Sequence, residues 1–383
     1  MTEKNINFLS WKSLPPKAGR IILIIFSIIL VCIIALVSVL LLWSYPGKPK
    51  PFVDKNGNSL PGSISEKIYV NINGIKQGMF IKSEDQKNPV LLYLHGGMPD
   101  YFLTAKYPTG FENYFTVCWW EQRGSGISYN TDTSSESVTI DQLVSDTLEV
   151  TNYLRHRFHK NKIYLMGHSG GTFIGIQVAE RAPDLYYAYI GVAQMSNQLQ
   201  SEKLAYDYML KQFKADGNIK MIRKLEAAPV SLKDGIPDAY LAVRDQAMHS
   251  LGIGTIHDMR SVVDGIFLES LQSREYTLSE KFNTWRAKLS SGVDILSDTM
   301  MATDLAKKVP KLDIPVYFFH GIYDYTCNYT LAKEYFQKLK APVKGFYTFK
   351  KSAHSPIFEE PEKVQKILQE DVLAGTSSLA DKK

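Results

Sequence analysis

The chain has 383 residues, of which 45% are hydrophobic and 12% aromatic, so it can bury a substantial core. Its formal charge of +5 comes from basic residues spread along the sequence rather than from a Lys/Arg stripe with interleaved aromatics, which argues against a nucleic-acid partner. Cys32, Cys118 and Cys327 lie far apart and give neither a disulfide framework nor metal-ligand spacing, and no histidine pair has metal spacing, so we expect no metal. We also expect no cofactor.

Residues 21–43 form an apolar segment without a charged residue. As a helix rising about 1.5 Å per residue, the segment spans roughly 30 Å of hydrocarbon. A cleaved signal peptide is the alternative, but its apolar run is normally about 7–15 residues long and ends at a small-residue cleavage site, a pattern that this sequence does not follow. We therefore predict an uncleaved, single-pass transmembrane helix over 21–43, with Trp43 and Tyr45 at the membrane interface.

The flanks of this segment bear on its orientation. Basic residues are slightly more numerous before it (Lys4, Lys12, Lys17 and Arg20) than after it (Lys48, Lys50 and Lys55). Under the positive-inside rule this small bias predicts a cytoplasmic tail at residues 1–20 and an exported domain beyond the segment. Residues 44–62 are rich in proline and glycine, and we expect an extended linker there.

The remaining sequence alternates short apolar runs with helical patterns. Strands are expected at 67–82 (a hairpin turning at Asn73-Gly74), 90–94, 115–120, 162–166, 187–193, 315–319 and 346–349. Helices are expected at 143–158, 170–181, 330–339 and 361–372. Continuous apolar strands that alternate with helices predict an α/β fold in which a mainly parallel sheet is flanked by helices on both faces.

Residues 196–312 break this alternation, because they are rich in helix formers and contain no clear buried strand. We interpret them as a helical cap inserted between two parts of the core, residues 63–195 and 313–383. Ligands of α/β sheets bind at the carboxyl ends of the strands, so an insertion at that edge would cover the binding site.

A nucleophilic serine is predicted where the strand at 162–166 ends. Residues 167–171 read Gly-His-Ser-Gly-Gly, which fits the G-x-S-x-G pattern between a strand and a helix. This pattern makes a sharp turn that lifts the hydroxyl of Ser169 above the sheet, and its outer glycines allow the strand and helix backbones to approach closely.

Two backbone amides are candidates for an oxyanion hole. The sequence His95-Gly96-Gly97 also follows a strand, and we expect the amide of Gly97 to be the first donor, with those of Gly96 and Met98 as alternatives. The second donor is expected from the residue after the nucleophile, Gly170.

The acid and the base of the predicted triad come late in the sequence. Asp324 directly follows the strand at 315–319, whereas the alternative acid, Asp313, precedes it. After Asp324 the chain has one histidine, His354, which we assign as the general base. The order serine, aspartate, histidine is the one expected for the α/β-hydrolase fold. The remaining histidines have simpler interpretations, and those next to motifs are expected to pack or form hydrogen bonds near the site (His95, His168 and His320).

Five sequence blocks together resemble the proline iminopeptidase branch of the α/β-hydrolases. They are HGGMPD at 95–100, WWEQRGSGIS at 119–128, GHSGGTFIGIQVAERAPD at 167–184, HGIYD at 320–324 and AHSP at 353–356. The resemblance covers residues 65–200 and 310–370 and is weak in the cap. It implies an aminopeptidase that uses the Ser-Asp-His triad to remove N-terminal residues from short peptides.

The sequence departs from this family at three motif positions. Met98 interrupts the usual HGGPG, and Glu121 stands where the family usually has aspartate. Gly170 stands where the family usually has a tryptophan that helps to wall the substrate pocket, so specificity for proline is in doubt. Epoxide hydrolases and haloalkane dehalogenases share the fold but need an aspartate at position 169, where this chain has serine.

Other functions remain open at this point. A carboxylesterase or related acyl hydrolase would use the same triad, and a catalytically idle, membrane-tethered binding protein would keep the fold. An aminopeptidase needs a carboxylate for the substrate's free amine, and family members take it from the cap. Glu269, in the apolar setting GIFLES, is our first candidate and Glu202 our second, and Glu226, Asp264 and Glu275 are further cap carboxylates. The sequence does not indicate an oligomeric state.

Overall fold

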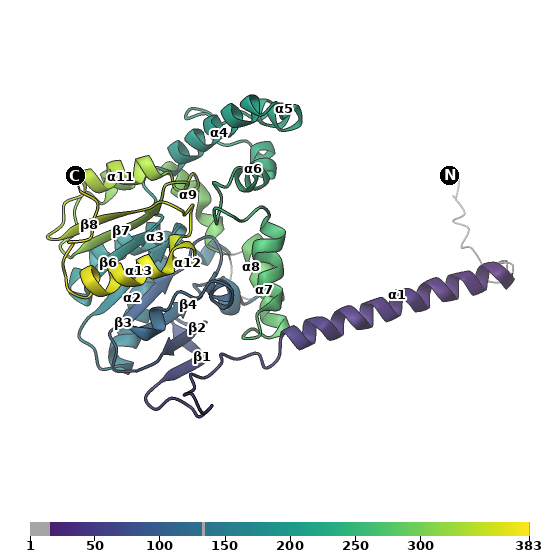
Figure 1. Cartoon of the computed structure of the whole chain (residues 1–383), viewed down its shortest axis with the longest axis horizontal. Coiled ribbons are helices and arrows are strands. Elements are labelled where there is room, and N and C mark those ends of the chain that lie inside the picture. The colour runs from purple at the N-terminus through teal and green to yellow at the C-terminus, as the bar shows by residue number, and fades with distance from the viewer. Residues whose placement is uncertain (1–15, 132–134, 291, 383) are drawn as a thin grey trace, which may run out of the picture.

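The computed structural model describes residues 16–131, 135–290 and 292–382, and the first fifteen residues of the expected tail lie outside these ranges. Eight strands form one sheet in the order β1-β2-β4-β3-β5-β6-β7-β8 (Figure 1). The strands are β1 Ile64–Ile72, β2 Ile75–Ser83, β3 Val90–Leu94, β4 Thr116–Trp120, β5 Ile163–His168, β6 Tyr186–Val192, β7 Val316–Gly321 and β8 Lys344–Phe349. β2 pairs antiparallel with β1 and β4, and all other neighbours are parallel.

The prediction of a mainly parallel sheet buried on both faces is confirmed. Every residue of β3, β4, β5 and β7 is buried, as continuous apolar runs require. Alternate residues of one strand enter different cores: Leu92 and Leu94 of β3 pack in one apolar cluster, and Leu91 and Tyr93 pack in the other. The hairpin between β1 and β2 turns at Asn73-Gly74, where both residues have positive φ, as a two-residue hairpin turn requires.

Helices cover both faces of this sheet (Figure 1). The first cluster is completed by α2 (Ile140–Arg157), α3 (Gly170–Arg181) and α11 (Tyr329–Lys338), and the second by α12 (Pro356–Glu359) and α13 (Pro361–Ile367). Leu154, Ile174 and Tyr335 belong to the first cluster, whereas Ile357 and Val364 belong to the second.

The segment between β6 and β7 is helical. It comprises α4 Gln198–Ala215, α5 Ile219–Glu226, α6 Asp238–Ser250, the π-helix η7 Val263–Phe267, α7 Leu268–Gln272, α8 Leu278–Ser290, η8 Val293–Leu296, α9 Ser297–Ala302 and α10 Leu305–Lys308. Helices α4 to α6 have an apolar cluster of their own, which includes Met209, Leu225 and Tyr240. In Figure 1 these helices stand off one edge of the sheet, and we refer to the segment as the cap.

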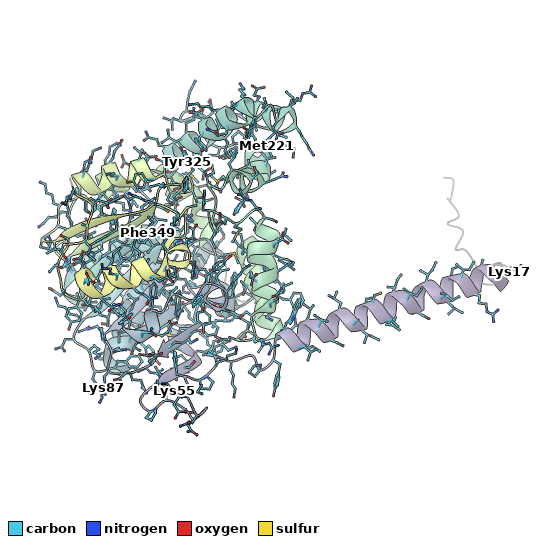
Figure 2. All side chains as sticks on the ribbon, in the orientation of Figure 1. Lys17, Lys55, Lys87, Met221, Tyr325 and Phe349 are labelled. Atoms are coloured by element: carbon cyan, nitrogen blue, oxygen red, sulfur yellow. The ribbon has the colours of Figure 1, made fainter. Side chains whose placement is uncertain are left out.

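The apolar N-terminal segment forms helix α1 (Pro16–Trp43), which contains the predicted span at 21–43. Its side chains project away from the rest of the protein along nearly the whole helix (Figure 2). No residue of its most apolar stretch is buried. The helix is long and apolar enough to cross a membrane, and a signal sequence near the N-terminus would show the same two properties.

The end of α1 and the first residues of the expected linker at 44–62 contact the cap. Lys281 of α8 donates from Nζ to the carbonyl oxygen of Trp43 (3.0 Å), to Oγ of Ser44 (3.1 Å) and to the carbonyl oxygen of Leu271 (2.6 Å). The amide of Gly47 donates to the carbonyl oxygen of Arg274 at 3.0 Å. A helix end leaves carbonyl groups without partners, and the lysine supplies one here, a contact that proline and glycine content could not reveal.

Candidate active site

Ser169 lies in the sharp turn between β5 and α3, with φ 55° and ψ −124°. Positive φ is costly for a residue with a side chain, and such strain is typical of functional turns. A Cβ atom on Gly171 would lie 2.1 Å from the carbonyl oxygen of Leu94, and one on Gly167 would lie 2.6 Å from the carbonyl oxygen of Gly171. The two glycines are therefore required by backbone contact, as the pattern in the sequence suggested.

Asp324 and His354 meet at the carboxyl edge of the sheet. Asp324 follows β7, His354 lies in the loop between β8 and α12, and His354 Nδ1 is 3.0 Å from Asp324 Oδ2. The other carboxylate oxygen, Oδ1, accepts a hydrogen bond from the amide of Cys327 at 2.9 Å, and His320 Nε2 lies 3.2 Å from Oδ2. The carboxylate is completely buried and is fixed from three sides.

The pKa values of Asp324 and His354 both lie below their usual ranges, for different physical reasons. Burial disfavours the ionised form of Asp324, but the His354 and His320 imidazoles outweigh burial and hold the pKa of Asp324 well below its usual range. Burial lowers the pKa of His354, and the neighbouring carboxylate of Asp324 only partly compensates. The histidine is therefore neutral at neutral pH, the state in which it can accept a proton.

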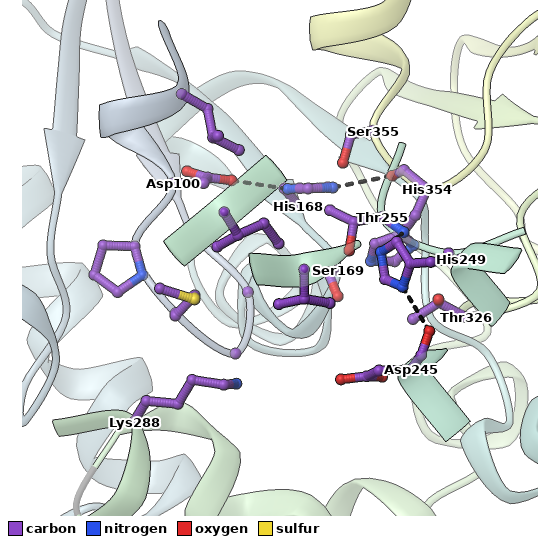
Figure 3. Close-up of a pocket in the computed structure, with 18 of the residues that line it drawn as sticks. Asp100, His168, Ser169, Asp245, His249, Thr255, Lys288, Thr326, His354 and Ser355 are labelled. Carbon is purple, nitrogen blue, oxygen red and sulfur yellow. Dashed lines mark hydrogen bonds and ion pairs between the residues drawn. The ribbon is translucent and has the colours of Figure 1, made fainter. Parts of the chain in front are cut away.

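Ser169 and His354 line the same pocket, which has a volume of about 220 Å³ (Figure 3). The loop after β3 closes against the serine: a Cβ atom on Gly96 would lie 3.1 Å from Ser169 Oγ. This loop is held by Gln122, which donates its backbone amide to His95 Nε2 (3.1 Å) and its side-chain amide to the carbonyl oxygen of His95 (2.8 Å).

The expected oxyanion donors lie beside the serine. Gly97 lines the pocket with Ser169, and Gly170 is the first residue of α3, so its amide has no acceptor within its own helix. The amide of Gly96 remains an alternative donor, because this residue is packed directly against Ser169.

A buried chain of polar groups supports the loop that carries His354. Tyr93 donates its hydroxyl to Asp100 Oδ2 (2.6 Å), the same oxygen lies 3.0 Å from His168 Nδ1, and His168 Nε2 lies 3.0 Å from the carbonyl oxygen of His354 (Figure 3). Burial lowers the pKa of His168, but the hydrogen bond and charge of Asp100 outweigh it and raise the pKa. The second residue of the serine motif thus contributes to the position of the histidine.

Glu359 is a further support, and the sequence analysis did not identify it. Its Oε1 accepts from the amides on either side of His354, those of Ala353 (3.0 Å) and Ser355 (3.2 Å), and its Oε2 accepts from the amide of His257 in the cap (2.6 Å). Burial raises the pKa of Glu359 to about 7. The only local sequence signal is an acidic residue in the first turn after Ser355, where helix N-termini favour negative charge.

The two cap carboxylates expected to bind an amine have different surroundings. Glu202 is buried, and Arg244 occupies both its oxygens, with Nη2 2.6 Å from Oε1 and Nε 2.7 Å from Oε2. Glu269 accepts from Lys106 Nζ at 2.6 Å and lines a separate pocket that does not include Ser169. The structure therefore does not bring Glu269 together with the triad.

Asp245 is a cap carboxylate that lines the serine pocket. It lies at the rim (Figure 3), its side chain is 63% exposed, and its Oδ1 accepts from Arg244 Nη1 at 2.9 Å. No motif marked Asp245 in the sequence, because its place on the serine pocket depends on where the fold puts helix α6.

A second, smaller pocket of about 130 Å³ also borders Ser169. Methionines dominate its wall (Met195, Met300 and Met301), together with Val293, and none of the described residues that line it is charged. The pocket borders Gly170, where the nearest atoms to an added Cβ would be Met300 Cε and Val293 Cγ1, both at 3.6 Å. The absence of a side chain at position 170 therefore leaves this space open.

Comparisons with known proteins agree with this geometry. Residues 90–226 match the family model described as serine aminopeptidase, S33. The chain is 33% identical over 303 residues to the probable aminopeptidase YbaC of Bacillus subtilis (strain 168). The aligned region covers 78% of this chain and 93% of that protein. At the level of fold it is similar to a proline iminopeptidase-related protein from Thermus thermophilus (TM-score 0.56, 17% identity, 81% of this chain and 98% of that one). It is also similar to the proline iminopeptidase of Mycobacterium smegmatis (TM-score 0.55, 15% identity, 81% and 99%).

Proposed function

The chain belongs to the α/β-hydrolase family, in the branch of the S33 serine aminopeptidases and proline iminopeptidases, and we propose that it is a membrane-anchored aminopeptidase that cleaves short peptides. The observation that carries this proposal is the hydrogen-bonded pair His354 and Asp324, which shares one edge of the sheet with Ser169 in its strained turn. The enzyme class follows from the family, whereas the roles of the residues are our assignment.

In the proposed mechanism Ser169 Oγ attacks the substrate carbonyl carbon and gives its proton to His354 Nε2. Asp324 fixes the imidazole through Nδ1 and stabilises its charged form. The amides of Gly97 and Gly170 donate to the oxyanion of the tetrahedral intermediate. His354 then protonates the leaving amine, and a water molecule that it activates hydrolyses the acyl-enzyme.

We assign recognition of a free substrate amine to Asp245 rather than to the two cap carboxylates expected from the sequence. A cation at the pocket rim needs an accessible carboxylate, and Asp245 is exposed there. Arg244 binds both oxygens of the buried Glu202, whereas it contacts one oxygen of the exposed Asp245, and Glu269 lies in another pocket.

A carboxylesterase is the second candidate function, and the small methionine-lined pocket favours it. An uncharged pocket beside the nucleophile suits an acyl chain as well as an apolar amino-acid side chain. The two functions differ in their need for an amine. An aminopeptidase should cleave free N-termini much better than N-acetylated ones, and Asp245→Asn should remove that preference, whereas an esterase should show none.

The test of the triad is the Ser169→Ala variant of the full-length protein. Turnover and labelling by a fluorophosphonate probe should both be lost, while the free energy of unfolding should stay within about 1 kcal/mol of the wild type, because the change is small and local. Substantial turnover in the pure variant would contradict the assignment. A wild-type protein that the probe does not label would point to a catalytically idle binding protein.

We also propose that α1 is an uncleaved anchor and that the catalytic domain lies outside the cytoplasm. The length and apolar composition of the helix and its attachment to the cap through Lys281 support the anchor, and the slight excess of basic residues before the helix supports the orientation. The full-length protein should stay in membranes after carbonate washing and keep Met1, and protease added to spheroplasts should reach the domain. A mature soluble form that begins near residue 44 would favour a signal peptide.

A further inference from the structure

The outer face of the cap beside α1 is apolar and exposed. Leu289 and Phe282 of α8 are 87% and 58% exposed, and Val263 and Phe267 of η7 are exposed as well. Phe267 packs against Trp285 with ring centroids 5.1 Å apart, so the two segments form one surface, which we call the cap apron. Contiguous exposed apolar groups on a soluble domain indicate a contact surface.

The part of the apron that α8 contributes is the exposed face of that helix. Phe282, Arg286 and Leu289 follow the spacing of one helix face, while Thr284 and Ala287 on the opposite face are buried. Across Leu278–Ser290 the exposed positions are apolar, basic or serine, and the helix's one acidic residue, Glu280, is buried. Apolar and basic groups on one face are typical of helices that lie in a membrane interface.

The anchor helix leaves the protein at this same edge. Lys281 of α8 binds the last carbonyl group of α1, so the two helices are in direct contact. In Figure 1, α8 forms the border of the domain and runs across the direction in which α1 projects. A bilayer crossed by α1 would therefore have its surface alongside α8 and η7.

Charged and aromatic residues near the junction fit the same arrangement. Tyr45 is highly exposed directly after α1, and Lys48, Lys50 and Arg274 are exposed close by. Tyrosine is enriched at membrane interfaces, and lysine and arginine bind anionic headgroups. The apolar apron and these cations together match the two layers of a lipid surface.

We infer that the cap apron lies in the membrane interface and that the lipid bilayer is its partner. This inference depends on the proposed anchoring by α1. The inner side of the same segments, at Val262, Ile266 and Trp285, lines the serine pocket. An amphiphilic substrate, such as a lipid-linked peptide or an acyl ester, thus reaches Ser169 from the bilayer past the residues that divide the membrane from the pocket.

Fluorescent labels on the full-length protein in liposomes test the position of the apron. The background is Cys32→Ser, because Cys118 and Cys327 are buried and burial raises the pKa of both thiols, which keeps them unreactive. A nitrobenzoxadiazole label is attached at Leu289→Cys or, as the matched control, at Leu232→Cys, which is also an exposed leucine (58%) but lies between α5 and α6.

The label at position 289 should emit at a shorter wavelength than in water, be quenched by spin-labelled acyl chains and be protected from quenching by iodide. The label at position 232 should emit as in water, be quenched by iodide and not be quenched by the acyl chains. Equal iodide quenching at the two positions would overturn the inference. Protection from iodide without quenching by acyl chains would also overturn it, because a protein would then cover the apron. Failure of the protein to float with liposomes would refute the anchor itself, whereas flotation with a water-exposed label refutes only the apron.

A second measurement tests access to the substrate. The double variant Phe282→Glu, Leu289→Glu should keep the wild-type rate on p-nitrophenyl acetate in solution but lose most of its rate on a long-chain ester embedded in vesicles. If the double variant kept the wild-type rate on both substrates, delivery from the bilayer would be contradicted. If it lost rate equally on both substrates, the substitutions would have damaged the active site instead.

Discussion

We predict that one substitution beside the small pocket, Gly170→Trp, changes the substrate specificity. Gly170→Trp introduces the side chain that resembles the proline iminopeptidase pattern, and it fills the space bordered by Met300 and Val293. An added Cβ has its nearest neighbours at 3.6 Å, which is ordinary van der Waals contact, so the backbone and the amide of residue 170 should stay in place. Gly170→Ala is the matched control, because it adds a Cβ and leaves the pocket open.

The size of the effect follows from the volume of the pocket. A cavity of about 130 Å³ takes roughly four groups of about 30 Å³ each, the liquid volume of a water molecule. At about 0.8 kcal/mol per buried methylene, filling it contributes about 3 kcal/mol. This energy corresponds to roughly a hundredfold higher kcat/KM for a substrate whose apolar group enters the pocket.

The assay compares kcat/KM for matched short and long substrates, either p-nitrophenyl acetate and hexanoate or Gly- and Leu-p-nitroanilide. The wild type and Gly170→Ala should prefer the longer group, and Gly170→Trp should lose most of that preference while it keeps its rate on the shorter substrate. An unchanged preference in Gly170→Trp, with the short substrate still cleaved, would refute binding in this pocket.

Three further outcomes follow from the geometry. Because burial lowers the pKa of His354 and the neutral imidazole is the base, kcat/KM should rise with pH and reach half its plateau below pH 6.5, and a midpoint above pH 7 would contradict this base. Arg123→Met should lower the free energy of unfolding in urea by about 3–5 kcal/mol, since it leaves the buried carboxylate of Asp146 without its ion pair; a loss below 1 kcal/mol would show that the pair adds little. Glu359→Ala should lower kcat more than it changes KM, because the loop of His354 loses its support, and an unchanged kcat would limit Glu359 to a structural role.

The parts of the fold that sequence patterns predict are those that local chemistry determines. The strands could be located because a buried parallel strand must be apolar along its whole length, as in β3 and β7. Ser169 could be located because a strained turn between a strand and a helix needs glycines at Gly167 and Gly171. His354 was assigned as its proposed partner by chain order, since one histidine follows Asp324.

Contacts between distant segments were beyond sequence patterns. Glu269 sits in an apolar stretch and was expected to need a substrate cation, but Lys106 from the core supplies that charge. Glu202 has its own partner in Arg244, forty-two positions away. Asp245 carries no local signal at all. Specificity residues in the cap depend on which helices meet above the sheet, and periodicity contains no information on that arrangement.

The hydrogen bond from Lys281 to the end of α1 has a mechanical consequence. Transmembrane helices adjust to the thickness of a bilayer by tilting. Here the last carbonyl group of α1 is tied to α8, the helix that also carries Trp285 in the pocket wall. If α1 spans a bilayer as proposed above, a change of its tilt in a thinner or thicker membrane would be transmitted through this hydrogen bond to α8 and to the pocket wall at Trp285. The rate of hydrolysis would then report the thickness of the surrounding membrane.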